Sequence, residues 1–169
     1  MKPEIETLLN NQVKYEANAS MHYMAMASWA DANGYNGIAD FFYTHSEEER
    51  QHMIKLVKFI NERGGNAEIP ALEKPKSDFS SLNELFEDFL SSEEFVTQKI
   101  NEIIFECLQH KDYNVHNFMQ WYVSEQLEEE AMARSILDKL TIIGDDKTGH
   151  YIFDRDIMSF INTQEDTQQ

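Results

Sequence analysis

Hydrophobic residues recur at the spacing of an α-helix in four long stretches of the chain. These stretches predict four helices, at about residues 3–33, 38–63, 81–110 and 113–143. Turn-forming residues separate them: Gly34 and Gly37 follow the first stretch, Gly64 and Gly65 the second, and Gly144 the fourth. No alternating run of the kind that marks a strand stands out. The pattern therefore predicts an all-α protein.

The segment between the second and third helices, from Gly64 to Ser80, contains Pro70 and Pro75 and few helix formers. A connection this long inside a compact domain needs a structural reason. The second helix would be about 40 Å long, and an extended connector could span roughly 55 Å. The connector can therefore run the length of a bundle, which predicts two helical hairpins joined by one long crossover.

A short amphipathic segment, at about residues 151–161, follows the fourth helix. It is too short to be a stable helix alone, so we expect it to pack on the bundle or on other subunits. Residues 162–169 are polar and are expected to be disordered. The predicted organisation is a single domain over residues 1–161 with a polar C-terminal tail at 162–169.

Composition narrows the possible partners. With 31 acidic residues against 14 basic ones, the formal net charge is −17. This balance disfavours nucleic acid and anionic membranes and favours cations. No run approaches the ~20 apolar residues of a membrane span, and Met1–Glu4 is not an apolar signal region. The one cysteine, Cys107, lies on an apolar stripe, so we expect a core residue in a reducing compartment, the cytoplasm.

Each of the four predicted helices carries a glutamate on its apolar stripe near its midpoint: Glu16, Glu49, Glu93 and Glu129. At ~1.5 Å per residue, the four carboxylates would lie within about 5 Å of one level in a bundle. His52 follows Glu49 by three residues and shares its helix face. Buried carboxylates with one imidazole need cations and suit iron, manganese or zinc, with a shared carboxylate bridging two ions. The rival chemistry, a carboxylate pair sharing one proton, needs only two acids and usually a substrate cleft.

The chain resembles bacterial non-haem ferritins over essentially its full length. The matching features, in order, are Glu16 with Tyr23, the motif Glu49-Arg50-Gln51-His52, Glu93 ahead of Thr97-Gln98-Lys99-Ile100-Asn101-Glu102, and the run from Trp121 to Glu130. One Glu-x-x-His alone is a weak signal, whereas this ordered set is specific. The resemblance implies a ferritin-like four-helix bundle with a long crossover and a short fifth, C-terminal helix.

The resemblance also implies a di-iron centre. One iron would be held by Glu16, Glu49 and His52, and a second by Glu49, Glu93 and Glu129, with Glu49 bridging. Tyr23 would lie beside the first iron and Gln126 beside the second. A third iron site would be formed by Glu48, Glu125 and Glu128 with Glu129 shared. Without the resemblance, Glu48 and Glu128 would be interpreted as solvated residues.

Departures from related families bear on the cofactor. Bacterioferritins and ribonucleotide-reductase-like proteins have a second Glu-x-x-His on the fourth helix, where this chain has Met132. Bacterioferritins also have a methionine haem ligand at the place of Arg50, so iron without haem is expected. The positions that line acidic pores in vertebrate ferritins resemble His116 and Met119, which leaves the iron entry route open. His45, one turn before Glu49, is expected to support the ligands from outside the centre.

The implied function is iron storage. A ferroxidase centre would oxidise Fe(II) with O2 or peroxide and deposit hydrated ferric oxide inside a homo-oligomeric shell, with twenty-four subunits in the family. The main alternative is a rubrerythrin-like di-iron peroxide reductase, which would favour a second Glu-x-x-His and a four-cysteine module. A DNA-protecting mini-ferritin would usually have a basic tail and no fifth helix. A metal-free interaction bundle would leave four buried carboxylates unexplained.

Overall fold

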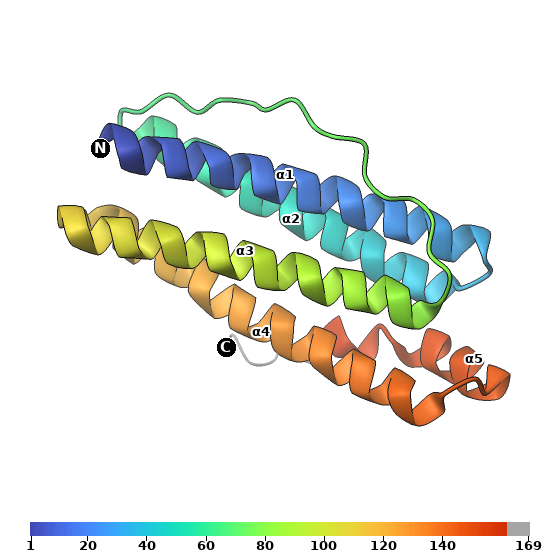
Figure 1. The fold of residues 1–169 in the computed structure, drawn as a ribbon. Helices are drawn as coiled ribbons and strands as arrows, with labels where there is room; N and C mark the ends of the chain where they lie inside the picture. The colour runs from blue at the N-terminus through green and yellow to red at the C-terminus, as the bar shows by residue number, and fades with distance from the viewer. Residues whose placement is uncertain (162–169) are drawn as a thin grey trace.

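The computed structural model describes residues 1–161 and is all-α over that range (Figure 1). Its helices are α1 (Pro3–Ala32), α2 (Asn36–Glu62), α3 (Leu82–His110), α4 (Tyr113–Ile143) and α5 (Lys147–Asp156). The four long helices begin and end within two residues of the predicted positions. The fold class is therefore confirmed. The polar tail expected at 162–169 lies outside the described residues.

The long connector runs along the bundle beside α1, from the end of α2 to the opposite end where α3 begins (Figure 1). Because it spans this length, α2 and α3 run in the same direction, as predicted. Polar contacts hold the connector to α1: Asn10 Nδ2 donates to Asn66 O at 3.1 Å, and Glu68 N donates to Asn10 Oδ1 at 2.8 Å. Near its end, Phe79 is buried edge-on against Trp29.

Side-chain caps fix where α3 and α4 begin. Glu84 N donates to Ser81 Oγ at 3.1 Å, which is one half of a capping box. The Glu84 carboxylate accepts from Ser80 N at 2.7 Å instead of from Ser81 N. At the start of α4, Asp112 accepts from Val115 N and also lies 3.0 Å from Arg63 through both carboxylate oxygens. This ion pair links the end of α2 to the start of α4.

The fifth helix begins earlier than the pattern predicted, at Lys147 instead of about residue 151. The reason is an N-cap: the Asp146 carboxylate accepts hydrogen bonds from Thr148 N and Gly149 N. The helix then packs on the start of α2, where Ile38 N donates to Asp154 Oδ1 at 2.9 Å. A Cβ at Gly37 would lie 1.8 Å from Asp154 O, so this contact requires glycine.

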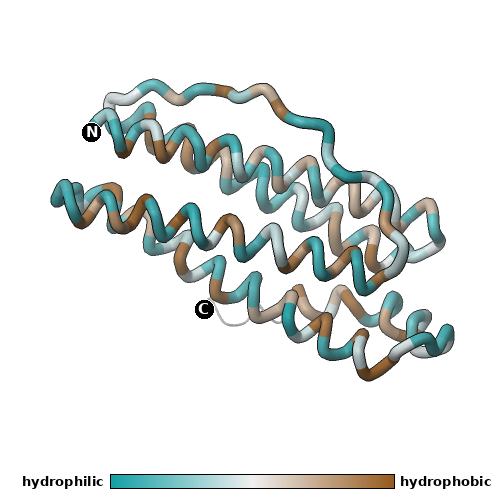
Figure 2. Tube along the Cα trace, viewed as in Figure 1, coloured by the Kyte–Doolittle hydropathy of each residue, from teal (hydrophilic) through white to brown (hydrophobic). Residues whose placement is uncertain are grey.

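The interior consists of two apolar clusters with a polar layer between them, and Figure 2 shows hydrophobic positions on the facing sides of the helices. The first cluster, near α5, includes Met26, Phe41, Phe42, Phe86, Phe89, Ile136 and Leu140. The second cluster includes Leu9, Val13, Leu56, Ile60, Ile100, Ile103, Cys107 and Met119. Along each long helix, the change from one cluster to the other falls at the buried glutamate. The apolar clusters therefore fix the height of the polar layer.

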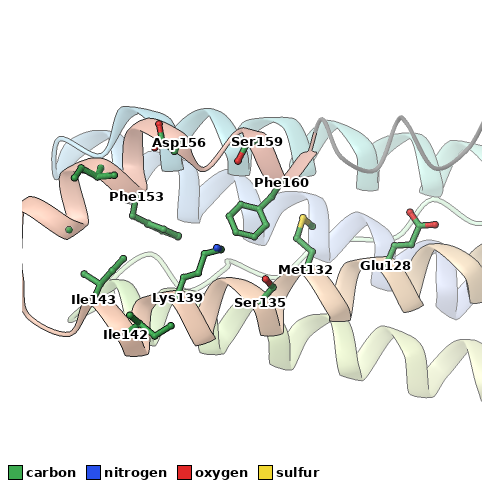
Figure 3. A pocket seen from close by; sticks show the side chains of 12 residues that line it. Glu128, Met132, Ser135, Lys139, Ile142, Ile143, Phe153, Asp156, Ser159 and Phe160 are labelled. Atoms are coloured by element: carbon green, nitrogen blue, oxygen red, sulfur yellow. The ribbon is translucent and has the colours of Figure 1, made fainter.

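A groove of about 970 Å³ lies between α4 and α5 (Figure 3). It is lined mainly by apolar side chains such as Ile142, Phe153 and Phe160, with Lys139 among them and Glu128 at one end. Ile142 is 85% exposed. The groove is separate from the buried carboxylates of the four helices. Among residues 1–161, the structure contains no helix with both the length and the hydrophobicity of a membrane span.

Candidate metal centre

The polar layer contains one buried glutamate from each long helix. Glu16 on α1 is 1% exposed, Glu49 on α2 is 3%, Glu93 on α3 is 1% and Glu129 on α4 is 5%. The structure thus brings together, inside the bundle, the four carboxylates that the stripe pattern placed at one level. His52 lies in the same layer and is 8% exposed. Such a concentration of buried acid is costly unless protons or cations neutralise it.

Glu16, Glu49 and His52 form a tight group in which one ligand atom from each lies within 4.8 Å of the others. His52 Nδ1 is 3.3 Å from Glu49 Oε2 and 3.9 Å from Glu16 Oε2. Gln12 Nε2 donates to Glu16 Oε1 at 2.8 Å, and Tyr122 OH donates to the His52 carbonyl at 2.8 Å. This is the residue set expected to hold the first iron.

Glu93 is held by two protein donors. The Tyr23 hydroxyl donates to Glu93 Oε1, and Gln126 Nε2 donates to Glu93 Oε2 at 2.9 Å. Tyr23 was expected beside the first iron position, and its hydroxyl bonds to the expected ligand of the second. Gln126, expected beside the second iron, donates to the other oxygen of this same candidate ligand. Both oxygens of Glu93 therefore have fixed directions before any metal binds.

Glu129 faces a histidine of the neighbouring helix. Its Oε2 lies 3.4 Å from His45 Nε2, and His45 Nδ1 lies 2.9 Å from the Phe41 carbonyl. The carbonyl can only accept, so the Nδ1 proton is directed to Phe41. His45, Glu48 and Glu129 form a second group with ligand atoms within 4.8 Å of one another. His45 is thus nearer to the carboxylates than the sequence indicated.

The three consecutive glutamates on α2 have different environments. Glu47 is exposed and accepts two hydrogen bonds from Arg50, at 2.8 and 2.7 Å. Glu48 is half-buried, and Glu49 is buried beside His52. Glu49 thus lies on the inner face of the helix, where the apolar stripe placed it. Arg50, at the place of the bacterioferritin haem ligand, is exposed on the outer side of the helix.

The remaining predicted third-site residues lie on α4. Glu125 and Glu128 are both half-buried. Neither belongs to a three-ligand group within 4.8 Å among residues 1–161. Met132, where related families have a second histidine, is 6% exposed and packs in the apolar cluster near α5.

Without metal, Glu16, Glu49 and Glu93 have pKa values raised toward their neutral forms. Burial and the nearby charge of Glu49 raise the pKa of Glu16 well above its ordinary value. Burial and the charge of Glu93 do the same to the pKa of Glu49. Burial and Glu129 raise the pKa of Glu93 to about 7. The chain can therefore hold protons in this layer, and a cation entering it would displace them.

The pKa values of His45 and Tyr23 are raised as well. Burial alone would lower the pKa of His45, but the adjacent Glu129 carboxylate outweighs it and the pKa rises to about 9. Burial and Glu93 raise the pKa of Tyr23 above its ordinary value. In the metal-free protein at neutral pH, His45 is thus a cation opposite Glu129, and Tyr23 is a neutral donor.

Sequence reasoning missed several supporting residues. Gln12, one turn before Glu16, carried a usable signal because it is a polar residue on an apolar stripe. Ser20 and Ser46 donate reciprocally to each other's backbone carbonyls at 2.7 Å, holding α1 close to α2. Thr97 donates to Glu130 at 2.6 Å, a contact between α3 and α4 that no spacing within one helix could reveal.

Buried carboxylates with an imidazole, in the middle of a four-helix bundle, are the arrangement of ferritin-like carboxylate proteins. The sequence matches the model of the ferritin-like domain over residues 6–143. With this match and the relatives described next, the chain belongs to the ferritin family.

Two relatives carry bacterial non-haem ferritin names. The chain is 41% identical over 157 residues to a probable bacterial non-haem ferritin-like protein of Haemophilus influenzae, covering 93% of this chain and 95% of that protein. It is 40% identical over 155 residues to a bacterial non-haem ferritin of Campylobacter jejuni, with coverage of 92% and 93%. Among solved structures, an open-pore ferritin of Archaeoglobus fulgidus has a TM-score of 0.91 at 36% identity, covering 92% and 96% of the two chains.

Proposed function

We propose that the protein stores iron and oxidises Fe(II) to Fe(III) at the buried layer between the two apolar clusters. The observation that carries this proposal is the tight group of Glu16, Glu49 and His52 inside a layer that also holds Glu93 and Glu129. Non-haem ferritin relatives at about 40% identity support iron as the metal. Iron is the substrate here, and it arrives as Fe(II) and leaves as Fe(III).

In this proposal, Glu16, Glu49 and His52 bind the first Fe(II). Glu49 also reaches the second Fe(II), together with Glu93 and Glu129. The shared carboxylate would keep the two ions close enough to be oxidised together. The second position has only oxygen ligands because Met132 replaces the second histidine. An all-oxygen site holds Fe(II) less firmly and suits an ion that moves on.

Two residues orient Glu93 during turnover. Tyr23 and Gln126 each hold one of its carboxylate oxygens, so the protein sets the orientation of this carboxylate. His45 neutralises Glu129 while the layer is empty. Metal binding replaces this contact and the protons on the glutamates. The positive charges of His45 and of the glutamate protons are therefore replaced by those of the metal ions. The buried carboxylates are neutralised both with and without metal.

The overall reaction releases protons. Two Fe(II) ions give one electron each to O2, and with four water molecules they yield two FeO(OH), one H2O2 and four protons. If peroxide is the oxidant, it takes the two electrons and is reduced to water.

The half-buried glutamates Glu48, Glu125 and Glu128 lie beside the centre on α2 and α4 and are proposed as a third iron site shared with Glu129.

Storage further requires a hollow assembly, for which we propose a shell of twenty-four copies. Exposed apolar residues on α5 and at the end of α4, among them Ile142, Tyr151 and Ile152, form a surface that another copy would cover. Size measurement before and after loading with Fe(II) in air tests this proposal. A large particle that gains dense iron cores is expected. A monomer that precipitates iron in solution would overturn it.

A further inference from the structure

A hydrogen-bonded chain connects the candidate ligand Glu93 to the protein surface through the α3–α4 contact. Gln126 Nε2 lies 3.3 Å from Thr97 Oγ1, and Thr97 Oγ1 lies 2.6 Å from Glu130 Oε1. The other oxygen of Glu130 accepts from Arg134 Nη2 at 2.6 Å. Gln126 and Glu93 are buried, Thr97 and Glu130 are partly buried, and Arg134 is half exposed.

Arg134, at the outer end of this hydrogen-bonded series, determines which group donates and which accepts in each hydrogen bond. Glu130 pairs with the guanidinium of Arg134, and a carboxylate so paired can only accept. Thr97 must therefore donate its single hydroxyl proton to Glu130. Its oxygen is then left to accept a hydrogen bond, and the donor in reach is the amide nitrogen of Gln126.

This order of donors and acceptors fixes the orientation of the Gln126 amide group. Two further acceptors, Glu93 O at 3.1 Å and Glu93 Oε2 at 2.9 Å, lie around the same nitrogen. If the amide were reversed, its oxygen would face the Glu93 carbonyl, which can only accept, and an oxygen of Thr97 that has no proton left to give. In the fixed orientation, the only group that Gln126 can offer to a cation is its amide oxygen.

We propose that Thr97 and Glu130 are positioning residues for the second metal position, acting through Gln126 to hold Glu93 in place. This inference rests on the proposed di-iron function. Neither residue is a ligand in it. The pair sets the direction of the Gln126 amide from outside the layer, and the amide sets the direction of the Glu93 carboxylate.

Co(II) titration without iron or oxidant chemistry tests the proposal, using its visible absorption to count ions. Thr97→Val keeps the side-chain shape and removes the hydroxyl, so we expect the second Co(II) to bind about three- to tenfold more weakly and the first unchanged. Thr97→Ser keeps the hydroxyl and should bind like the parent. Thr141→Val, an exposed threonine at the far end of α4, is the matched control.

The proposal also requires that Thr97 act only through Gln126. In a Gln126→Ala background, Thr97→Val should therefore weaken the second Co(II) no further. Equal second-ion affinity in the parent and Thr97→Val, or an undiminished loss in the Gln126→Ala background, would overturn the positioning role. A parent that binds fewer than two Co(II) per chain would overturn the proposed di-iron function itself, a different and recognisable result.

Discussion

His45 Nε2 lies 3.4 Å from Glu129 Oε2 in the interior of the bundle, and neither atom has a hydrogen-bond partner among residues 1–161. The other ring nitrogen of His45 is held by the Phe41 carbonyl at 2.9 Å. The imidazole is thus fixed at one end and faces a buried carboxylate at the other. In the metal-free protein, the His45 imidazole supplies the positive charge that neutralises the Glu129 carboxylate.

This pair predicts a stability defect that metal repairs. His45→Ala should destabilise the metal-free protein by about 3–5 kcal/mol because it leaves Glu129 buried without a cation. Added Co(II) should recover much of that loss. Chemical denaturation with and without Co(II) measures both effects, with His110→Ala as the control because His110 is exposed. Equal stability of the two variants would show that His45 does not neutralise Glu129.

The stability of the metal-free protein should fall as pH rises. Glu93 has a pKa of about 7 in the folded protein, above the ~4.3 of an unfolded glutamate, so the folded state binds the extra proton. Its contribution, on the order of 3 kcal/mol, is complete below about pH 4 and is lost as pH rises through 7. His45, with a pKa of about 9, adds a loss between about pH 6.5 and 9.

Denaturation midpoints of the chelator-treated protein from about pH 4.5 to 9 test this dependence. Glu93→Gln cannot titrate at that position, so its midpoint should change less with pH between 4.5 and 7. Saturating Co(II) should flatten the curve further, since bound metal keeps the carboxylates deprotonated. A metal-free parent whose stability increases over this range would contradict the raised pKa of Glu93.

Tyr23 offers a test of how Glu93 is oriented. Tyr23→Phe keeps the edge-on packing against Phe89 and removes the hydroxyl that donates to Glu93. We expect initial Fe(II) oxidation to slow by about tenfold, with the fold retained. Tyr15→Phe, which changes a half-buried tyrosine of the same helix, is the control for losing a phenol. Stopped-flow mixing with O2 measures both, and equal rates would exclude a role for the Tyr23 hydroxyl.

Gly37 tests how α5 is attached. Gly37→Ala places a Cβ against the Asp154 carbonyl, so either α5 or the start of α2 must move. The expected cost is about 1–3 kcal/mol of stability, together with weaker assembly if the α5 region is covered by other copies. Asp40→Ala, exposed on the same helix, should change neither. Denaturation measures the stability, and size chromatography measures the assembly. If Gly37→Ala matched the parent in both, α5 would not be packed tightly against α2.

The helices and the level of the carboxylates could be predicted because both follow from local rules. Apolar spacing and glycine stops set the ends of the long helices, and midpoint counting placed Glu16, Glu49, Glu93 and Glu129 together. Within one helix, register also placed His52 on the same face as Glu49. These inferences need only the geometry of an α-helix and the requirement that apolar faces meet.

Contacts between helices could not be predicted in the same way. Spacing put His45 near Glu49, but its pairing with Glu129 depends on how α2 faces α4. The hydrogen bond from Thr97 to Glu130 depends on how α3 faces α4. The start of α5 was missed because the apolar pattern begins after the Asp146 cap, which sets the helix start. Metal binding by any of these residues stays a prediction.

The central claim is that Glu49 joins two Fe(II) ions for oxidation, and comparing two neighbouring glutamates tests it most directly. Fe(II) is added anaerobically at two ions per chain, and formation of Fe(III) is followed by absorbance after O2 is admitted. Glu49→Ala should slow the initial rate by about 100-fold or more, whereas Glu47→Ala, which changes an exposed residue of the same helix, should match the parent. If Glu49→Ala oxidised Fe(II) as fast as Glu47→Ala, the proposed bridging role would be wrong.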